Sequence, residues 1–130
     1  MIIDIVLNKC YGGFSLSPFA MKSLLDSKST LIVRKVIDEA TFNDFKKFAK
    51  PYDGFWVPYS SCIIRRENSE YVSYELNDSD EFIFRTHPDL VNLLRKHGSK
   101  LVSGECAKLE IVEKYIDLGI DCHDGYETLD

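Results

Sequence analysis

Apolar residues are grouped along the chain in a way that predicts several β-strands. The first apolar run, residues 2–7, is rich in isoleucine and valine, which is typical of a buried strand. A second run of the same kind, residues 31–37, predicts another strand. Residues 59–66 and 70–76 flank the short polar turn 67–69, and this pattern predicts an antiparallel hairpin.

Helical spacing of apolar residues predicts three helices. A serine followed by a proline predicts a helix over residues 18–26, because serine caps a helix and proline is tolerated in its first turn. A second helix is predicted to begin at Thr41, with three phenylalanines on one side. The third begins at Pro88, carries leucines at helical spacing and ends at Gly98.

The remaining segments complete the predicted fold. The aromatic stretch 52–57 is interrupted by glycine and flanked by prolines, so we predict a loop there. Residues 82–85 are predicted to form a short strand, and 109–111 with 116–122 alternate like one or two half-exposed strands. The expected fold class is α+β, a single domain over residues 1–130 with a mixed or mainly antiparallel sheet and about three helices.

Composition narrows the protein class. The chain has 130 residues, 45% of them hydrophobic and 28% charged, which is ordinary for a globular domain. No apolar run approaches the ~20 residues that cross a bilayer, and the first twenty residues lack the pattern of an export signal. The four cysteines are scattered without the spacing of a metal site, so we predict that they are reduced thiols. We therefore expect a cytoplasmic protein (host cytoplasm if viral) with no membrane partner and no cofactor.

Net charge bears on the partners. The formal charge of −5 argues against general nucleic-acid binding, because such binding depends on clustered Lys and Arg that neutralise phosphates. A local basic patch remains compatible with that charge. We also expect a homodimer, because a pocket shared between subunits is a common way for so small a domain to enclose a ligand.

A glycine-rich loop is the first candidate binding site. Gly12, Gly13, Phe14 and Ser15 lie between the first predicted strand and the first predicted helix, where free backbone N–H groups and the helix dipole favour an anion. The loop lacks both the P-loop pattern and the dinucleotide pattern. A turn in which the glycines serve backbone geometry alone is the alternative.

The segment Arg85-Thr86-His87 is the second candidate, because it precedes the third predicted helix. The Arg85 guanidinium can make bidentate contacts with a phosphate or a carboxylate. The alternative is that Thr86 or His87 only caps the helix. If both helices follow parallel strands, the two candidate loops meet at one edge of the sheet and form one pocket.

An aromatic ring and a thiol are further candidates. Trp56 offers a planar face on which a base or a protein partner could stack, with core packing as the alternative. Cys10 could act as a nucleophile with His87 as its base, although lone cysteines are usually small buried apolar residues.

A metal site is not expected. Asp117, Asp121 and His123 share one face of the last predicted strand, which could hold a metal ion. Evenly spaced polar residues on a strand are more simply its solvent-facing side. We therefore predict no metal.

Three stretches of this sequence resemble a family of small uncharacterised phage and bacterial proteins. They are Asn8–Ser17, Arg85–Val91 and Gly104–Glu113, which contain the strings NKCYGGFSLS, RTHPDLV and GECAKLEIVE. Where the family has an acidic residue before the proline, this chain has His87. The resemblance implies a viral or mobile-element accessory protein, a setting in which small single-domain proteins often sequester a host ligand or protein.

Three function hypotheses follow. The first is a phage-type accessory protein that binds and sequesters a phosphate-bearing, nucleotide-derived small molecule, an anti-defence sponge using the Gly12–Gly13 amides, Arg85 and an aromatic ring. The second is an enzyme that processes a nucleotide or a nucleic-acid end with Cys10 or His87. The third is a protein-binding inhibitor of a host factor that uses an acidic surface and an exposed strand edge.

Overall fold

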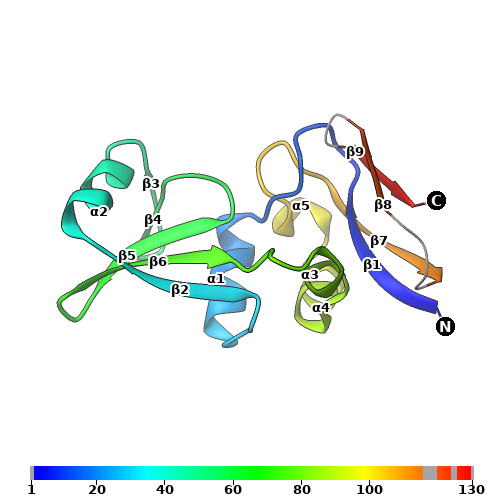
Figure 1. Ribbon diagram of the computed structural model, residues 1–130, viewed down its shortest axis with the longest axis horizontal. Coiled ribbons are helices and arrows are strands. Elements are labelled where there is room, and N and C mark those ends of the chain that lie inside the picture. Colours follow the sequence, from blue (N-terminus) through cyan, green and yellow to red (C-terminus); the bar gives the residue numbers. More distant parts are fainter. Residues whose placement is uncertain (1, 116–119, 124–125, 130) are drawn as a thin grey trace.

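A computed structural model of the chain describes residues 2–115, 120–123 and 126–129, with side chains up to Glu113. Figure 1 shows a five-stranded sheet with α1 (Pro18–Asp26) and α2 (Glu39–Lys46) in one half of the molecule. The other half contains the strand pair β1 (Ile2–Asn8) and β7 (Leu109–Tyr115) with the helices α3 (Glu81–Thr86) and α4 (Pro88–His97). The strand pairings are antiparallel, and three of the helices are longer than seven residues. The predicted α+β class is therefore confirmed.

The larger sheet has the strand order β2-β6-β5-β4-β3. Its centre is the predicted hairpin, formed by β5 (Cys62–Glu67) and β6 (Glu70–Leu76), in which Arg66 pairs with Tyr71. The edges are β2 (Ile32–Ile37) and the short β3 (Lys50–Tyr52), which pairs with β4 (Phe55–Val57).

The smaller sheet joins the two ends of the chain. β1 (Ile2–Asn8) pairs with β7 (Leu109–Tyr115) in a register that places Asn8 beside Leu109. A separate pair is formed by β8 (Ile120–His123) and β9 (Tyr126–Leu129). The predicted C-terminal strands therefore exist, although part of the 116–122 segment lies outside the described residues.

Two helices begin and end where the sequence predicts. In α1 (Pro18–Asp26) the Ser17 side chain accepts a hydrogen bond from the backbone of Ala20, as expected of a capping serine. In α4 (Pro88–His97) the capping residue is His87, and Gly98 ends the helix at a φ of 85°. The short α5 (Ser99–Val102) follows directly.

Two predictions near helix starts are wrong. α2 (Glu39–Lys46) begins before Thr41, because the Asp38 carboxylate caps it by accepting from the Thr41 backbone. Residues 82–85 belong to a helix, α3 (Glu81–Thr86), which Asp80 caps in the same way. In both places a capping aspartate outweighed the apolar pattern from which the prediction was made.

The aromatic stretch 52–57 is a hairpin and not the predicted loop. Asp53 and Gly54 both have positive φ, 45° and 86°, which is the backbone that a two-residue hairpin turn requires. The expectation of parallel strands is also wrong, because the described strand pairs are antiparallel and α4 follows a helix instead of a strand. The predicted route by which parallel strands would bring the two candidate loops to one sheet edge is therefore not found among the described residues.

One hydrophobic core spans both sheets. Val6 and Leu109 from the smaller sheet pack in the same cluster as Ile63 and Val72 from the larger one, with α1 and α4 between them. A smaller cluster of Phe42, Cys62 and Ile64 lies between α2 and the larger sheet. In the part of the chain that the structure describes, no helix is long and apolar enough to span a membrane.

Candidate functional site

The two glycines of the first candidate loop have structural reasons to be there. A Cβ atom on Gly12 would lie 2.0 Å from the carbonyl oxygen of Cys106, so only glycine fits against that neighbouring loop. Gly13 has a φ of 86°, a conformation that glycine adopts without strain. Close packing explains Gly12 and backbone conformation explains Gly13, while anion binding by their amides stays a prediction.

Arg85 is the most deeply buried of the charged side chains described. It is 3% exposed, and its Nε donates to Glu81 at 3.1 Å while its Nη1 donates to the Val6 carbonyl at 3.2 Å. Its guanidinium carbon also lies 4.7 Å from the ring centre of Phe14 and 5.2 Å from that of Phe84. These contacts link α3 to β1, so the geometry gives Arg85 a structural role.

Three predicted residues do line one pocket. Phe14, Ser15 and Arg85 lie around a space of about 530 Å³, which we call the Arg85 pocket. Its other charged lining residues are Lys35, Glu75, Asp78 and Glu81. Lys35 pairs with Glu75 at 2.9 Å, as Arg85 does with Glu81, so each cation already has an acidic partner. With three carboxylates to two cations, this pocket disfavours an anion.

Thr86 and His87 lie apart from that pocket and serve the helices. The Thr86 hydroxyl donates to the Phe82 carbonyl at 2.6 Å. His87 accepts the Asp89 backbone N–H at Nδ1 and lies 2.9 Å from the Thr30 hydroxyl at Nε2. Because both ring nitrogens are engaged, the geometry favours the capping interpretation over a catalytic base.

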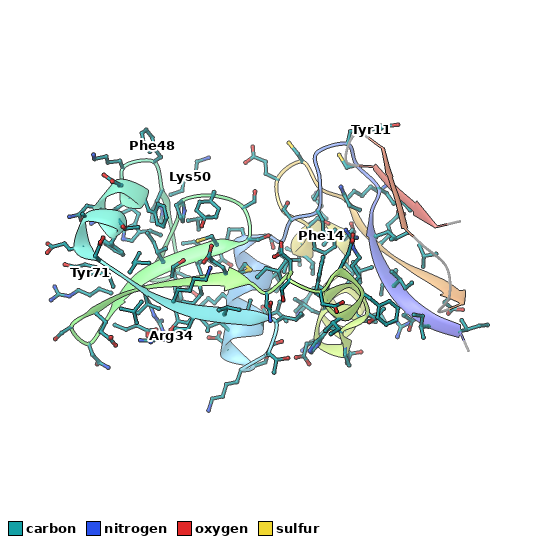
Figure 2. All side chains as sticks on the ribbon, viewed as in Figure 1. Tyr11, Phe14, Arg34, Phe48, Lys50 and Tyr71 are labelled. Atoms are coloured by element: carbon teal, nitrogen blue, oxygen red, sulfur yellow. The ribbon has the colours of Figure 1, made fainter. Side chains whose placement is uncertain are left out.

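Trp56 lies at a different site, on the face of the larger sheet that α2 covers. Figure 2 places Tyr71 beside α2 at one end of the molecule and Phe14 near its middle. A space of about 330 Å³ surrounds Trp56. We call it the basic-aromatic pocket, and its lining residues are Phe42, Asn43, Lys46, Gly54, Trp56, Arg65, Arg66 and Tyr71.

Two cations of the basic-aromatic pocket are held against aromatic rings. The ammonium nitrogen of Lys46 lies 4.9 Å from the ring centre of Trp56, and the guanidinium carbon of Arg66 lies 5.6 Å from that of Tyr71. Among the side chains described, neither cation forms a salt bridge. Arg65 differs, because it pairs with Glu67 at 2.7 Å.

The sheet and α2 together explain how this pocket forms. Lys46 lies one helical turn after Phe42, which is buried against the sheet, so the lysine is carried to the edge of that contact. Trp56 pairs with Ile64, and Arg66 lies two residues further along the same face of β5, opposite Tyr71. The sequence analysis assigned no role to Lys46 or to Arg66. The one available signal was the spacing of Lys46 from Phe42.

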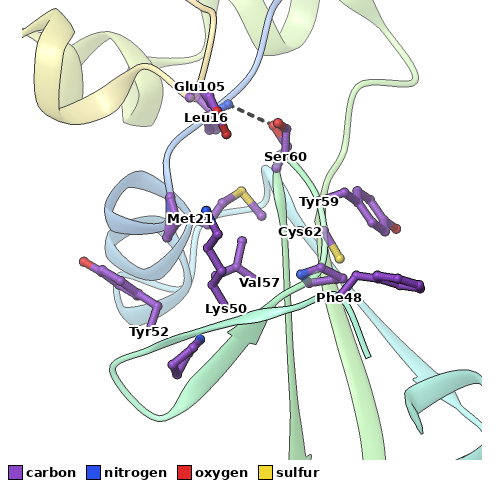
Figure 3. Close-up of a pocket in the computed structure, with 15 residues that line it drawn as sticks. Leu16, Met21, Phe48, Lys50, Tyr52, Val57, Tyr59, Ser60, Cys62 and Glu105 are labelled. Carbon is purple, nitrogen blue, oxygen red and sulfur yellow. Dashed lines mark hydrogen bonds between the residues drawn. The ribbon is translucent and has the colours of Figure 1, made fainter. Parts of the chain in front are cut away.

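A second space lies on the opposite face of the β3–β4 hairpin. We call this space, of about 500 Å³, the apolar cavity. Figure 3 shows Met21 of α1 above the cavity and Val57 and Lys50 of the hairpin below it. Along one wall, the backbone N–H of Leu16 donates to the Ser61 hydroxyl at 2.9 Å. Its apolar lining residues are Leu16, Pro18, Met21, Phe48, Pro51, Tyr52, Val57, Pro58 and Tyr59.

The cysteines offer little support for nucleophilic chemistry. Burial raises the pKa of the Cys62 thiol, so this residue stays protonated at neutral pH, and its sulfur lies 3.5 Å from the Ser73 hydroxyl. Cys10 is half-buried and Cys106 is exposed. The described side chains contain no cluster of three residues able to hold a metal. The side chains of Asp117, Asp121 and His123 lie outside the described residues.

Comparison with known proteins adds no relative to this picture. No protein-family model, no curated protein and no solved structure matches the chain.

Proposed function

We propose that the protein binds a phosphate-bearing, nucleotide-derived small molecule in the basic-aromatic pocket. The observation that carries the proposal is that aromatic rings and cations share this pocket without any carboxylate among its lining residues. A volume of about 330 Å³ falls at the lower end of the range for small-molecule sites. The ligand class is the one expected from the sequence, but the proposed site keeps only Trp56 of the residues predicted for it.

Lys46 and Arg66 are the proposed phosphate ligands. A phosphate monoester carries close to two negative charges at neutral pH, and these two cations lack a salt-bridge partner among the described side chains. Because the aromatic rings already hold both cations near the pocket, little side-chain freedom remains to be lost on binding. Charge-assisted hydrogen bonds to phosphate are among the stronger contacts that such a surface can make.

Trp56 and Tyr71 are the proposed stacking residues. A base stacked on an aromatic side chain contributes about 1–3 kcal/mol in nucleic-acid complexes. The amide of Asn43, at the rim of the same pocket, can both donate to and accept from the edge of a base. A ring to stack on, cations for the phosphate and an amide for the base edge are together what a nucleotide requires.

The proposal is a binding protein and not an enzyme. The lining residues of the basic-aromatic pocket include no Cys, His, Asp or Glu, the groups that most often serve as nucleophile, acid or base. A site that holds a nucleotide with cations and aromatic rings, and without the commonest catalytic groups, is suited to sequestration. In the phage setting that the resemblance implies, this would make the protein a sponge for a nucleotide signal of the host.

The fluorescence of Trp56 gives a direct test, because it is the only tryptophan of the chain. We expect AMP and ADP-ribose to quench it saturably, whereas adenosine, which lacks the phosphate, binds at least about tenfold more weakly. The double variant Lys46→Met/Arg66→Met should lose AMP binding. The matched control is Lys47→Met, because Lys47 directly follows Lys46 at the C-terminal cap of α2 but pairs with Asp44.

Two results would refute this function. One is equal binding of AMP by the double variant and the Lys47→Met control. The other is the absence of any quenching across mono-, di- and cyclic nucleotides.

A second candidate function is protein binding, which one observation favours. Ile2, Phe82 and Ile83 are each about half exposed or more, and the first two line the same surface pocket between β1 and α3. Contiguous exposed apolar side chains often mark a protein contact. If this surface carries the function, Phe82→Ser/Ile83→Ser should abolish co-purification of a defined host protein that Lys46→Met/Arg66→Met still retains.

A further inference from the structure

The apolar cavity is a second site, separate from the proposed nucleotide pocket. Side chains alternate between the two faces of a strand, so Val57 faces the cavity while its neighbour Trp56 faces the basic-aromatic pocket. Lys50, which is paired with Val57 in the β3–β4 register, lines the same cavity. The hairpin therefore separates two sites of different chemistry.

Lys50 is the one cation among the lining residues of the apolar cavity. Figure 3 shows its side chain reaching up from β3 into the cavity, toward Met21. Among the side chains that the structure describes, no carboxylate forms a salt bridge with Lys50. Lys50 is exposed, so its ammonium group is accessible to an anion at the edge of the apolar walls.

The opposite rim of the cavity carries the opposite charge. Glu105 lines the cavity from the 104–105 loop, and Figure 3 shows it beside Leu16, across the cavity from Lys50. Between the two charges, the walls from α1, the hairpin and the segment 57–59 are apolar or aromatic, and Ser60 and Ser61 add hydroxyl groups on one side. A ligand with anions at both ends would meet Glu105 and be repelled.

The mouth of the cavity also exposes apolar surface to water. Phe48 is 85% exposed and Tyr59 is 47% exposed, and both line the cavity. Large aromatic side chains left in water at the rim of an unfilled apolar space are typical of a binding site. Filling the space with an apolar body would remove this surface from water, which is favourable in proportion to the area buried.

We propose that the apolar cavity binds a small apolar molecule that carries a single carboxylate, of the class of a medium-chain fatty acid. Its carboxylate pairs with Lys50, and its apolar body lies against Val57 and Phe48. Glu105 selects against dicarboxylates at the far rim. This proposal does not depend on the nucleotide pocket, because no lining residue is shared between the two spaces.

Isothermal titration calorimetry with decanoate, below its micellar range, tests the proposal on the full chain. We expect saturable binding of one decanoate per chain. We expect 1-decanol and decylammonium to bind at least about tenfold more weakly than decanoate, and decanedioate to bind more weakly than decanoate as well. Lys50→Met keeps the apolar stem but removes the charge, and it should weaken decanoate binding about tenfold. Lys47→Met is again the matched control and should bind decanoate like the unmodified protein.

A second variant and a second readout guard against a purely structural effect. Val57→Phe fills the cavity from its floor and should block decanoate while leaving AMP quenching of Trp56 intact. Equal binding of decanoate by Lys50→Met and Lys47→Met would overturn the proposal, as would decanol binding as tightly as decanoate or the absence of any decanoate heat. AMP competing with decanoate would overturn the separation of the two sites.

Discussion

The Arg85 pocket and the basic-aromatic pocket contain similar residues but use them differently. Each combines cationic side chains with aromatic rings. In the Arg85 pocket the arginine is buried and bonded to Glu81 and to the β1 backbone, so its charge serves the fold. In the basic-aromatic pocket, Lys46 and Arg66 lie over rings without a salt bridge among the described side chains. A cation over an aromatic ring is therefore available to a ligand only where its donors are not already used.

The largest expected effect that tests this comparison is on stability. Arg85→Met should lower the free energy of unfolding by about 3 kcal/mol, because it removes charged hydrogen bonds and leaves the buried Val6 carbonyl without that donor. Arg66→Met, an exposed site, should change it by less than about 0.5 kcal/mol. Urea denaturation measures both. If both variants lost the same free energy of unfolding, the proposed difference between the two pockets would be contradicted.

A smaller effect is expected at the glycine loop. Gly12→Ala should cost about 1–3 kcal/mol, because the new Cβ would collide with the Cys106 carbonyl and both loops must shift. Gly54→Ala is the control: it has open space but a φ of 86°, so the loss should be near 1 kcal/mol from backbone strain alone. If Gly12→Ala is neutral in thermal unfolding, the packing explanation of this loop is wrong and ligand binding there gains support.

The smallest effect concerns stability in acid. It tests the contrast between Arg65, which pairs with Glu67, and Arg66, which forms no salt bridge among the described side chains. A hydrogen bond from Tyr74, followed by Arg65, lowers the pKa of Glu67 below its ordinary value of 4.5. A lowered folded-state pKa contributes stability that is fully present above the unfolded pKa and is lost as the pH falls through the folded one. The protein should therefore lose stability below about pH 4.5, and Glu67→Gln should show a shallower loss in pH-dependent urea titrations. An unchanged pH profile in Glu67→Gln would contradict this role of Glu67.

Local patterns in the sequence were sufficient for several elements. The Ser17-Pro18 pair, the leucines after Pro88 and the polar turn at 67–69 each predicted an element that the structure contains. The misassigned elements depended on single capping or turn residues. Asp80 caps a helix where the apolar residues suggested a strand, and the Asp53-Gly54 turn makes the aromatic stretch a hairpin.

The candidate site was less predictable than the fold. Phe14, Ser15 and Arg85 line one pocket, but not through the parallel strands on which that prediction depended. Of the other predicted residues, none lines this pocket: Gly12, Gly13, Thr86, His87 and Trp56. Lys46 and Arg66 were not singled out, because twenty residues separate them and nothing in their immediate neighbours distinguishes them from ordinary surface charges. Only the pairing of Arg66 with Tyr71 and the packing of Phe42 bring them to one pocket.

The sequence by itself determined the α+β class, the ends of α1 and α4 and the central hairpin, because these depend on side-chain periodicity and on hydrogen bonds between near neighbours. The tertiary structure alone decided which charges are neutralised and which remain available. That outcome depends on partners distant in the chain: the Val6 carbonyl lies 79 residues before Arg85, and the Tyr71 ring reaches Arg66 only through strand register. The sequence shows which residues are charged, but the folded surroundings decide whether a charge is already paired or is available to a ligand.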